Sequence, residues 1–314
     1  MKVRTLGTLG TLAASMMVIS ALGQQPESTP QQPEPPLHLT PDEIAIYRWA
    51  PTLIQWSRRQ IEECQVLHKL QPAESQAPLS QILERAGLTG DLAFHDFPQI
   101  TCDESVTSEV ASGDRTISKR QKFLYIVLPR PVGDVRVLEE YRTDLKGAPA
   151  NKFNLHNLFA LTIGFASSWL YLSSAEQPDS HFRYFGTQTL RNRKCHVVGF
   201  AQDPDKAQRV SEYRIQGKTA GLLLVQGLVW IDTQTFQALR VMTWLLAPRM
   251  DIGLDSQIST VEFYEVRPAG TDRTLWLPRD VNVWTLCRGV GVRNTHHYSN
   301  FKLFRVESTI KPAP

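Results

Sequence analysis

Two pairs of adjacent residues have side chains that could carry metal or nucleophilic chemistry. His296-His297 is the only histidine pair in the chain, and Cys195-His196 places a thiol beside an imidazole. Both pairs lie in stretches that alternate like β-strands, where successive side chains point to opposite faces. Two histidines on opposite faces cannot easily bind one metal, and a Cys-His dyad needs both groups on one face. Since the sequence has no HExxH motif, we predict neither a metal site nor a dyad.

Paired carboxylates are the other chemistry to consider. Glu139-Glu140 and the acids around Asp251 and Asp255 lie in polar stretches without a fixed second member, so we interpret them as solvated surface. There is no G-x-S-x-G, P-loop or G-x-G-x-x-G motif, and Gly289-Val290-Gly291 is typical of a hairpin turn. We therefore predict a protein that is not an enzyme and has no cofactor. A hydrolase whose site is assembled from residues distant in sequence is an alternative.

Tryptophans on predicted strands indicate a ligand rather than a reaction. Trp230, Trp244 and Trp284 lie in alternating apolar stretches, and Met242 shares a face with Trp244. A curved sheet would gather them on one side, where an apolar pocket suits a lipid or acyl chain. Core packing is the usual role of such side chains and is the competing interpretation. We predict Trp230, Met242, Trp244 and Trp284 as ligand-binding residues.

Four cysteines, Cys64, Cys102, Cys195 and Cys287, are disulfide candidates. Disulfides persist in exported proteins, and four cysteines allow three complete pairings. We favour Cys64 with Cys102 and Cys195 with Cys287, because each pair stays inside one predicted unit. Four buried thiols are the alternative. No CxxC motif is present, so neither a thioredoxin-like site nor a Cys-paired zinc site is indicated.

The N-terminus indicates export. Lys2 and Arg4 precede an apolar stretch over residues 6–22, and Gly23 ends a small-residue site. This order is typical of a secretory signal peptide, which we predict over residues 1–23. A membrane anchor is the alternative, but the stretch is short for a bilayer span and is diluted by Gly and Thr. We expect no transmembrane span after cleavage and a periplasmic or secreted location.

A Pro- and Gln-rich linker should follow the signal peptide. Residues 24–38 contain almost nothing to bury, so we predict that they are disordered. The formal net charge of the whole chain is only +3, and two of these charges belong to the signal peptide. Such a balance gives no electrostatic reason to expect a nucleic-acid partner.

Residues 39–98 are predicted to form a helical N-terminal segment. Thr40-Pro41-Asp42-Glu43 combines an N-cap hydroxyl, a proline at the first helical position and a glutamate at the third. This helix should break or kink at Pro51, which cannot donate to the backbone ladder, and then resume to Leu67. A second, short helix is predicted over residues 79–87, with Gly87 as its stop.

Residues 99–314 are predicted to form a curved antiparallel sheet domain. Its centre is a hairpin over residues 221–246, GLLLVQGLVWIDTQTFQALRVMTWLL, in which two alternating arms flank a polar turn. Both faces of this hairpin are semi-apolar, so each face needs a cover. Further strands over residues 100–142 and from residue 181 onward bring the total to about nine to eleven.

One apolar stretch favours a helix inside this sheet. Phe153–Leu172 is long and only weakly alternating, so we predict a buried helix near residues 155–172 that lies in the concavity of the sheet. A membrane helix is the competing interpretation, but polar residues such as Asn154 and Asn157 interrupt the stretch.

The strand order of the C-terminal half resembles a known family. The stretches GLVWIDTQTFQALRV, STVEFYEV, LWLPRDVNVW and RNTHHYSNFKLFRV follow one another as in the LolA/LolB-like lipoprotein carriers. The resemblance covers roughly residues 181–310 and, more loosely, residues 100–172. It implies an α+β half-barrel of about 9–11 strands that wraps one or more helices, with a cavity that takes acyl chains. The longer helical N-terminal part and the four cysteines depart from the carriers' pattern.

Together these patterns predict an exported, non-enzymatic protein. It would bind an apolar ligand, a lipid or a lipoprotein acyl chain, in the concavity of the sheet. The alternative, from a different class, is an envelope interaction or sensor module that uses the sheet as a scaffold and binds an envelope protein partner.

Overall fold

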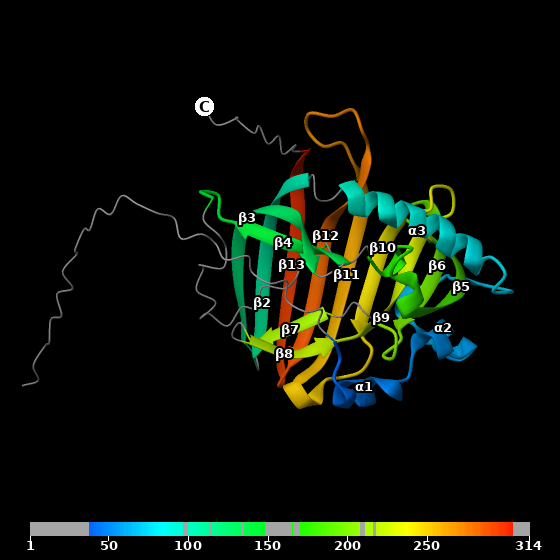
Figure 1. Ribbon diagram of the computed structural model, residues 1–314. Coiled ribbons are helices and arrows are strands. Elements are labelled where there is room, and N and C mark those ends of the chain that lie inside the picture. The colour runs from blue at the N-terminus through cyan, green and yellow to red at the C-terminus, as the bar shows by residue number, and fades with distance from the viewer. Residues whose placement is uncertain are drawn as a thin grey trace, which may run out of the picture. The chain divides into compact units, whose positions relative to one another are not determined.

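One large antiparallel sheet dominates the computed structural model, which describes residues 38–96, 100–112, 115–132, 135–147, 165, 170–207, 211–215 and 218–303. All of these residues belong to one compact unit, Glu34–Pro314. In the described part, eleven strands pair in the order β1-β5-β6-β9-β10-β11-β12-β13-β2-β3-β4, and β7 and β8 form a separate hairpin (Figure 1). The sheet is open, and the prediction of an α+β fold with about nine to eleven curved antiparallel strands is confirmed.

The elements have the following bounds. The strands are β1 Gln71–Pro72, β2 Ile100–Ser112, β3 Arg115–Val132, β4 Val135–Thr143, β5 Ser180–Leu190, β6 Arg193–Gln202, β7 Ser211–Ile215, β8 Lys218–Leu223, β9 Val225–Asp232, β10 Ala238–Leu245, β11 Leu254–Val266, β12 Leu275–Cys287 and β13 Val290–Leu303. The helices are α1 Pro41–Arg48, η1 Leu53–Gln55, α2 Arg58–Glu63, η2 Gln65–Leu67, α3 Leu79–Asp96, η5 Leu170–Leu172, η6 Gln177–Asp179 and η7 Met250–Ile252. Over the described ranges, no helix is both long enough and apolar enough to span a membrane.

The central hairpin is formed by β9 and β10, as the alternating pattern predicts. Trp230 pairs with Arg240 and Val229 with Val241. Asp232 closes the turn, because its Oδ1 accepts hydrogen bonds from the backbone amides of Gln234 and Thr235 at 2.9 and 2.8 Å. The predicted strands over residues 100–142 are also present, as β2, β3 and β4.

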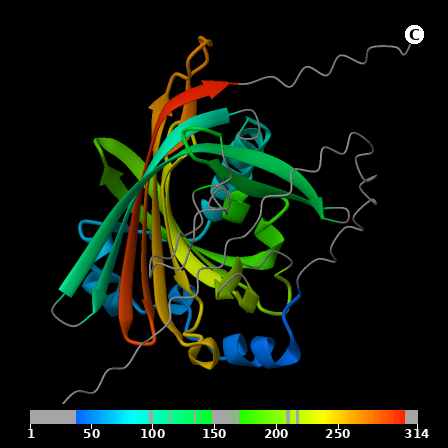
Figure 2. The same cartoon turned by 90° about the vertical axis from the view of Figure 1, so that its left-hand side faces the viewer.

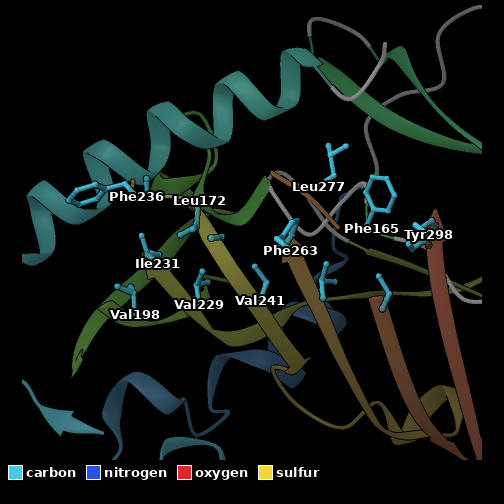
Figure 3. Packing of buried hydrophobic residues seen from close by; sticks show 14 of the residues in the cluster. Phe165, Leu172, Val198, Val229, Ile231, Phe236, Val241, Phe263, Leu277 and Tyr298 are labelled. Atoms are coloured by element: carbon cyan, nitrogen blue, oxygen red, sulfur yellow. The ribbon is translucent and has the colours of Figure 1, made fainter. Parts of the chain in front are cut away.

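The sheet is curved, and α3 lies on its concave side (Figure 2). We call the face that α3 covers the inner face. Ile82 and Ala86 of α3 belong to one buried apolar cluster with Val229, Ile231 and Val241 of the central hairpin (Figure 3). This cluster fills the space between α3 and the strands beneath it with the protein's own side chains.

The helix α3 continues past Gly87, where the sequence predicted its end. A Cβ atom at Gly87 would lie 2.7 Å from Ser174 Oγ and 2.8 Å from Gln177 Nε2. The same Gln177 amide donates to the backbone carbonyls of Leu83 and Leu172 at 2.9 and 2.8 Å. The predicted stop was wrong because this glycine permits a close approach of α3 to the chain at 172–177.

Residues 51–72 cover the opposite face of the sheet, which we call the outer face. Leu53 is fully buried there, and its amide donates to Gln226 Oε1 at 2.7 Å. A Cβ atom at Gly199 would overlap with Leu53 Cδ1, so the Leu53 side chain fits there only because residue 199 is a glycine. Each semi-apolar face of the sheet thus has a cover, as predicted from the hairpin sequence.

The start of α1 and the break after it agree with the sequence. Thr40 Oγ1 accepts from the Glu43 amide at 3.3 Å, while Glu43 Oε2 accepts from the Thr40 amide at 3.0 Å. The helix ends at Arg48, before Pro51, and the chain turns helical again in α2.

Other predictions fall partly or wholly outside the described residues. The predicted signal peptide lies there, as does the predicted linker except for His38. Of the helix predicted near 155–172, only Phe165 and Leu170–Leu172 are described, and the latter form a single 3-10 turn.

Candidate functional site

Three of the four predicted ligand-binding residues pack together on the outer face. Trp230 is buried in the outer cluster, and Met242 and Trp244 pack against that cluster with the N-terminal segment. The rings of Trp244 and Trp56 stack with centroids 6.1 Å apart, and Trp230 Nε1 donates to Gln188 Oε1 at 2.7 Å. The chain's own residues 51–72 therefore contact these side chains.

Trp284 lies on the same face but outside the cover. Cross-strand pairing places Trp284 beside Ile258, which in turn pairs with Trp244. The Trp284 residue is 41% exposed. The role of these four residues in ligand binding stays a prediction, now for the outer face rather than for the concavity.

The four cysteines are free, and neither predicted disulfide is formed. Cys64 packs against the outer cluster, whereas Cys102 belongs to the inner one, so the sheet separates them. Cys195 on β6 and Cys287 on β12 are four strand steps apart in the sheet. At about 4.8 Å per step, their separation of roughly 19 Å exceeds the ~7 Å between Cα atoms that a disulfide spans. Chain proximity was a poor guide because the sheet order differs from the chain order.

The adjacent pairs separate as their strand positions require. His297 is exposed and its Nδ1 contacts Asp280 at 2.7 Å, while His296 is completely buried on the inner face. Cys195 lies on the outer face, whereas the His196 ring lies near Tyr184, with 3.2 Å between Nδ1 and the hydroxyl. In the described ranges, no three His, Cys, Asp or Glu side chains gather in a way that could hold a metal ion.

A buried polar network lies on the inner face of β2, β4 and β13. Its centre is the carboxylate of Glu104, whose side chain is fully buried. Arg142 donates to both Glu104 oxygens, Nε to Oε2 at 2.5 Å and Nη2 to Oε1 at 2.9 Å. The Tyr298 hydroxyl donates to Oε1 at 2.8 Å, and His296 Nδ1 lies 2.8 Å from the same oxygen.

Glu140 extends this network and corrects one sequence interpretation. Its side chain is only 7% exposed, and its Oε2 accepts from Arg142 Nη1 at 3.3 Å. The interpretation of Glu139-Glu140 as solvated surface is wrong for Glu140. The reason is that Glu140 lies two residues from Arg142, on the same face of β4. By contrast, Asp251 is 43% exposed at its side chain, although it pairs with the buried Arg249.

The network is held in its charged form. Burial opposes ionisation of Glu104, but hydrogen bonds from Arg142 and His296 outweigh burial and lower the pKa of Glu104 to about 2. Burial also opposes the charge of Arg142, yet the bonds to Glu104 keep the Arg142 pKa well above its ordinary value. At neutral pH this part of the inner face therefore contains an ionised carboxylate–guanidinium pair joined by two hydrogen bonds.

Aromatic rings surround the network. The ring centroids of Tyr125, Tyr298 and Phe165 lie 4.8 to 5.1 Å from one another. The Arg142 guanidinium carbon lies 5.0 Å from the Tyr125 ring centroid. Figure 3 shows Phe165 and Tyr298 facing each other on the inner side of the sheet. The region thus combines buried aromatic rings with a few convergent polar groups, a combination that usually lines ligand sites.

The sequence did carry one signal for this network. On β2, the residues that point to the inner face alternate as Ile100, Cys102, Glu104, Val106, Ser108 and Val110. A glutamate within this otherwise small and apolar set is out of pattern, and a charged side chain on a buried face needs a partner. Its partners could not be named, because His296 is 192 residues away in the sequence.

Comparison with known proteins gives likenesses of structure only. No family model and no curated protein matches the chain. A LolA superfamily protein from Nitrosomonas europaea has 14% identity and a TM-score of 0.31, with 73% of this chain and 94% of that chain covered. A DUF1329 family protein from Desulfovibrio piger has 12% identity and a TM-score of 0.37, with 72% and 93% covered. A putative outer membrane lipoprotein-sorting protein domain from Vibrio parahaemolyticus has 8% identity and a TM-score of 0.35, with 71% and 92% covered.

These likenesses agree with the resemblance to LolA/LolB-like proteins found in the sequence. They concern the arrangement of the strands. At such identities and scores they say nothing about a ligand, so the function has to be argued from the residues of this chain.

Proposed function

We propose that this chain is an exported, non-enzymatic protein that binds an apolar ligand, a lipid or a lipoprotein acyl chain, on the inner face of its sheet. The observation that carries the proposal is the composition of the inner face over β2, β3, β4 and β13. Large apolar side chains, among them Val106, Phe123 and Tyr125, lie there beside one buried polar network centred on Glu104.

The position of α3 limits the part of the inner face that is open to a ligand. Beneath α3, the inner face packs against Ile82 and Ala86 and is filled by the protein's own side chains. The inner face over β2, β3 and β13 instead combines apolar side chains such as Val106 with the buried network centred on Glu104. We therefore place the ligand over β2, β3 and β13.

Native mass spectrometry tests the proposal. The protein, starting at Gln24, is purified from an exporting host without detergent and measured before and after organic extraction. We expect an added mass that leaves on extraction and is identified as a lipid. A clean protein mass would contradict the proposal and favour the interaction module with an envelope partner.

Two matched variants locate the ligand. Phe123→Ala removes a ring from the inner face, and Trp244→Ala removes one from the outer face. We expect Phe123→Ala to lower the lipid-bound fraction and Trp244→Ala to leave it unchanged. The reverse result would place the ligand at the predicted tryptophan residues.

A further inference from the structure

The hydroxyl of Tyr125 is a buried polar group. Tyr125 is 1% exposed, and its hydroxyl oxygen has no hydrogen-bond partner in the described part of the chain. Most buried hydroxyl groups in proteins are hydrogen-bonded, because burying an unpaired one costs free energy. An unpaired hydroxyl at a ligand site is therefore a candidate contact for the ligand.

The polar groups around this hydroxyl already form hydrogen bonds with one another. Tyr125 pairs with Arg142 on β4 and with Cys102 on β2. The Arg142 guanidinium is bound by the carboxylates of Glu104 and Glu140, so it offers no free positive charge to an incoming anion. The group contains two carboxylates, those of Glu104 and Glu140. A further anion placed beside them would be repelled.

The hydroxyl can act as a donor at neutral pH. Burial is the main cause that raises the Tyr125 pKa well above its ordinary value, and the nearby charge of Glu140 raises it further. The phenol therefore keeps its proton and can donate to an oxygen acceptor. The rings of Phe165 and Tyr298, with centroids 5.0 and 5.1 Å from that of Tyr125, supply apolar surface for the carbon atoms beside that acceptor.

We propose that Tyr125 donates a hydrogen bond to an uncharged carbonyl oxygen of the bound lipid, so that the site takes acyl esters in preference to free fatty acids. This inference rests on the proposed function and names the chemical class of its ligand. A fatty acid anion would meet the carboxylates of Glu104 and Glu140 and a guanidinium that both of them already bind. An uncharged ester carbonyl needs only one donor, which the Tyr125 hydroxyl supplies.

Binding of two probes with the same acyl chain tests this preference. A monoacylglycerol and the corresponding free fatty acid are titrated into the delipidated full mature chain at neutral pH, and dissociation constants are measured by native mass spectrometry. We expect the ester to bind more tightly. The Tyr125→Phe variant should bind the ester about five- to tenfold more weakly, the loss of one hydrogen bond, with unchanged binding of the fatty acid.

Thermal unfolding separates this role from a structural one. Removing an unpaired buried hydroxyl should leave the ligand-free protein as stable as the wild type or more stable. Tyr125→Phe would then weaken ester binding without weakening the fold. The control is Tyr264→Phe, since the Tyr264 ring lies between Arg191 and Arg279, outside this network.

The outcomes distinguish the two proposals. If neither probe binds, the proposed function fails, and this inference fails with it. If both probes bind but the fatty acid binds equally well or better, the inference is overturned while the proposed function stands. If Tyr125→Phe binds the ester as tightly as the wild type does, the inference is also overturned while the proposed function stands. The Tyr125 hydroxyl would then make no hydrogen bond to the ligand.

Discussion

The inner face of the sheet has two regions with different chemistry. Under α3, the strands β9 and β10 present Val229, Ile231 and Val241 to an apolar cluster. Toward the other edge, β2 and β13 present Glu104 and His296, both completely buried at their side chains. In the first region the strands contribute mainly apolar contacts. The second includes buried charges, which folding alone does not require and which usually cost more than well-packed apolar side chains. We therefore interpret the first region as the scaffold and the second region as the candidate site.

Removing one partner of the buried pair should have the largest effect. Arg142→Leu leaves the Glu104 carboxylate without its main hydrogen-bond donor, and such a change typically costs about 3–5 kcal/mol. Urea unfolding of the variant and the wild type measures this loss. The double variant Glu104→Leu/Arg142→Leu is the control, and it should recover much of the loss because no unpaired charge remains. A single variant as stable as the wild type would show that the pair is not energetically coupled.

Acid should weaken the region around Glu104 selectively. Because the folded-state pKa of Glu104 is lowered to about 2, its stabilisation is present above its ordinary pKa and is lost as the pH falls toward 2. The shift corresponds to roughly 3 kcal/mol. We expect wild type and Glu104→Gln to differ most near pH 7, and the difference to shrink between about pH 5 and pH 2. A difference that stays constant over this range would show that Glu104 is not held ionised.

A conservative change in the apolar region should have the smallest effect. Ile231→Val removes one buried methylene beneath α3 and should cost about 1 kcal/mol, with no dependence on pH beyond that of the wild type. Urea unfolding at pH 7 and at pH 3 measures both quantities. If the loss of unfolding free energy caused by Ile231→Val changed with pH, the two regions would be energetically coupled. They could then not be treated as independent.

The fold was largely predictable because strand alternation is a local property. The hairpin of β9 and β10, the strands β2 to β4 and the N-cap of α1 each follow from residues close together in the chain. The extent of α3 was not predictable, since the glycine at position 87 contacts Ser174 and Gln177, which are distant in sequence.

Alternation also cannot say which face of a strand is the inner one. Trp230 and Trp244 share a face, as predicted, but residues 51–72 cover that face. The site residues Glu104 and Arg142 were missed because their partners come from other strands. Only the misplaced charge of Glu104 among apolar inner-face residues could have indicated the network.

The strand order has a consequence for how the chain reaches this state. β13, the last strand in the sequence, lies between β12 and β2 and joins the sheet's C-terminal strands to β2, β3 and β4. Until residues 290–303 have been synthesised, β2 and β12 each present an unpaired edge, and the contact between Glu104 and His296 must close a loop of 192 residues. Long-range pairing of this kind is slow. We therefore expect the scaffold to form before the candidate site, and the unpaired edges of β2 and β12 to be the positions most exposed to aggregation in the interval.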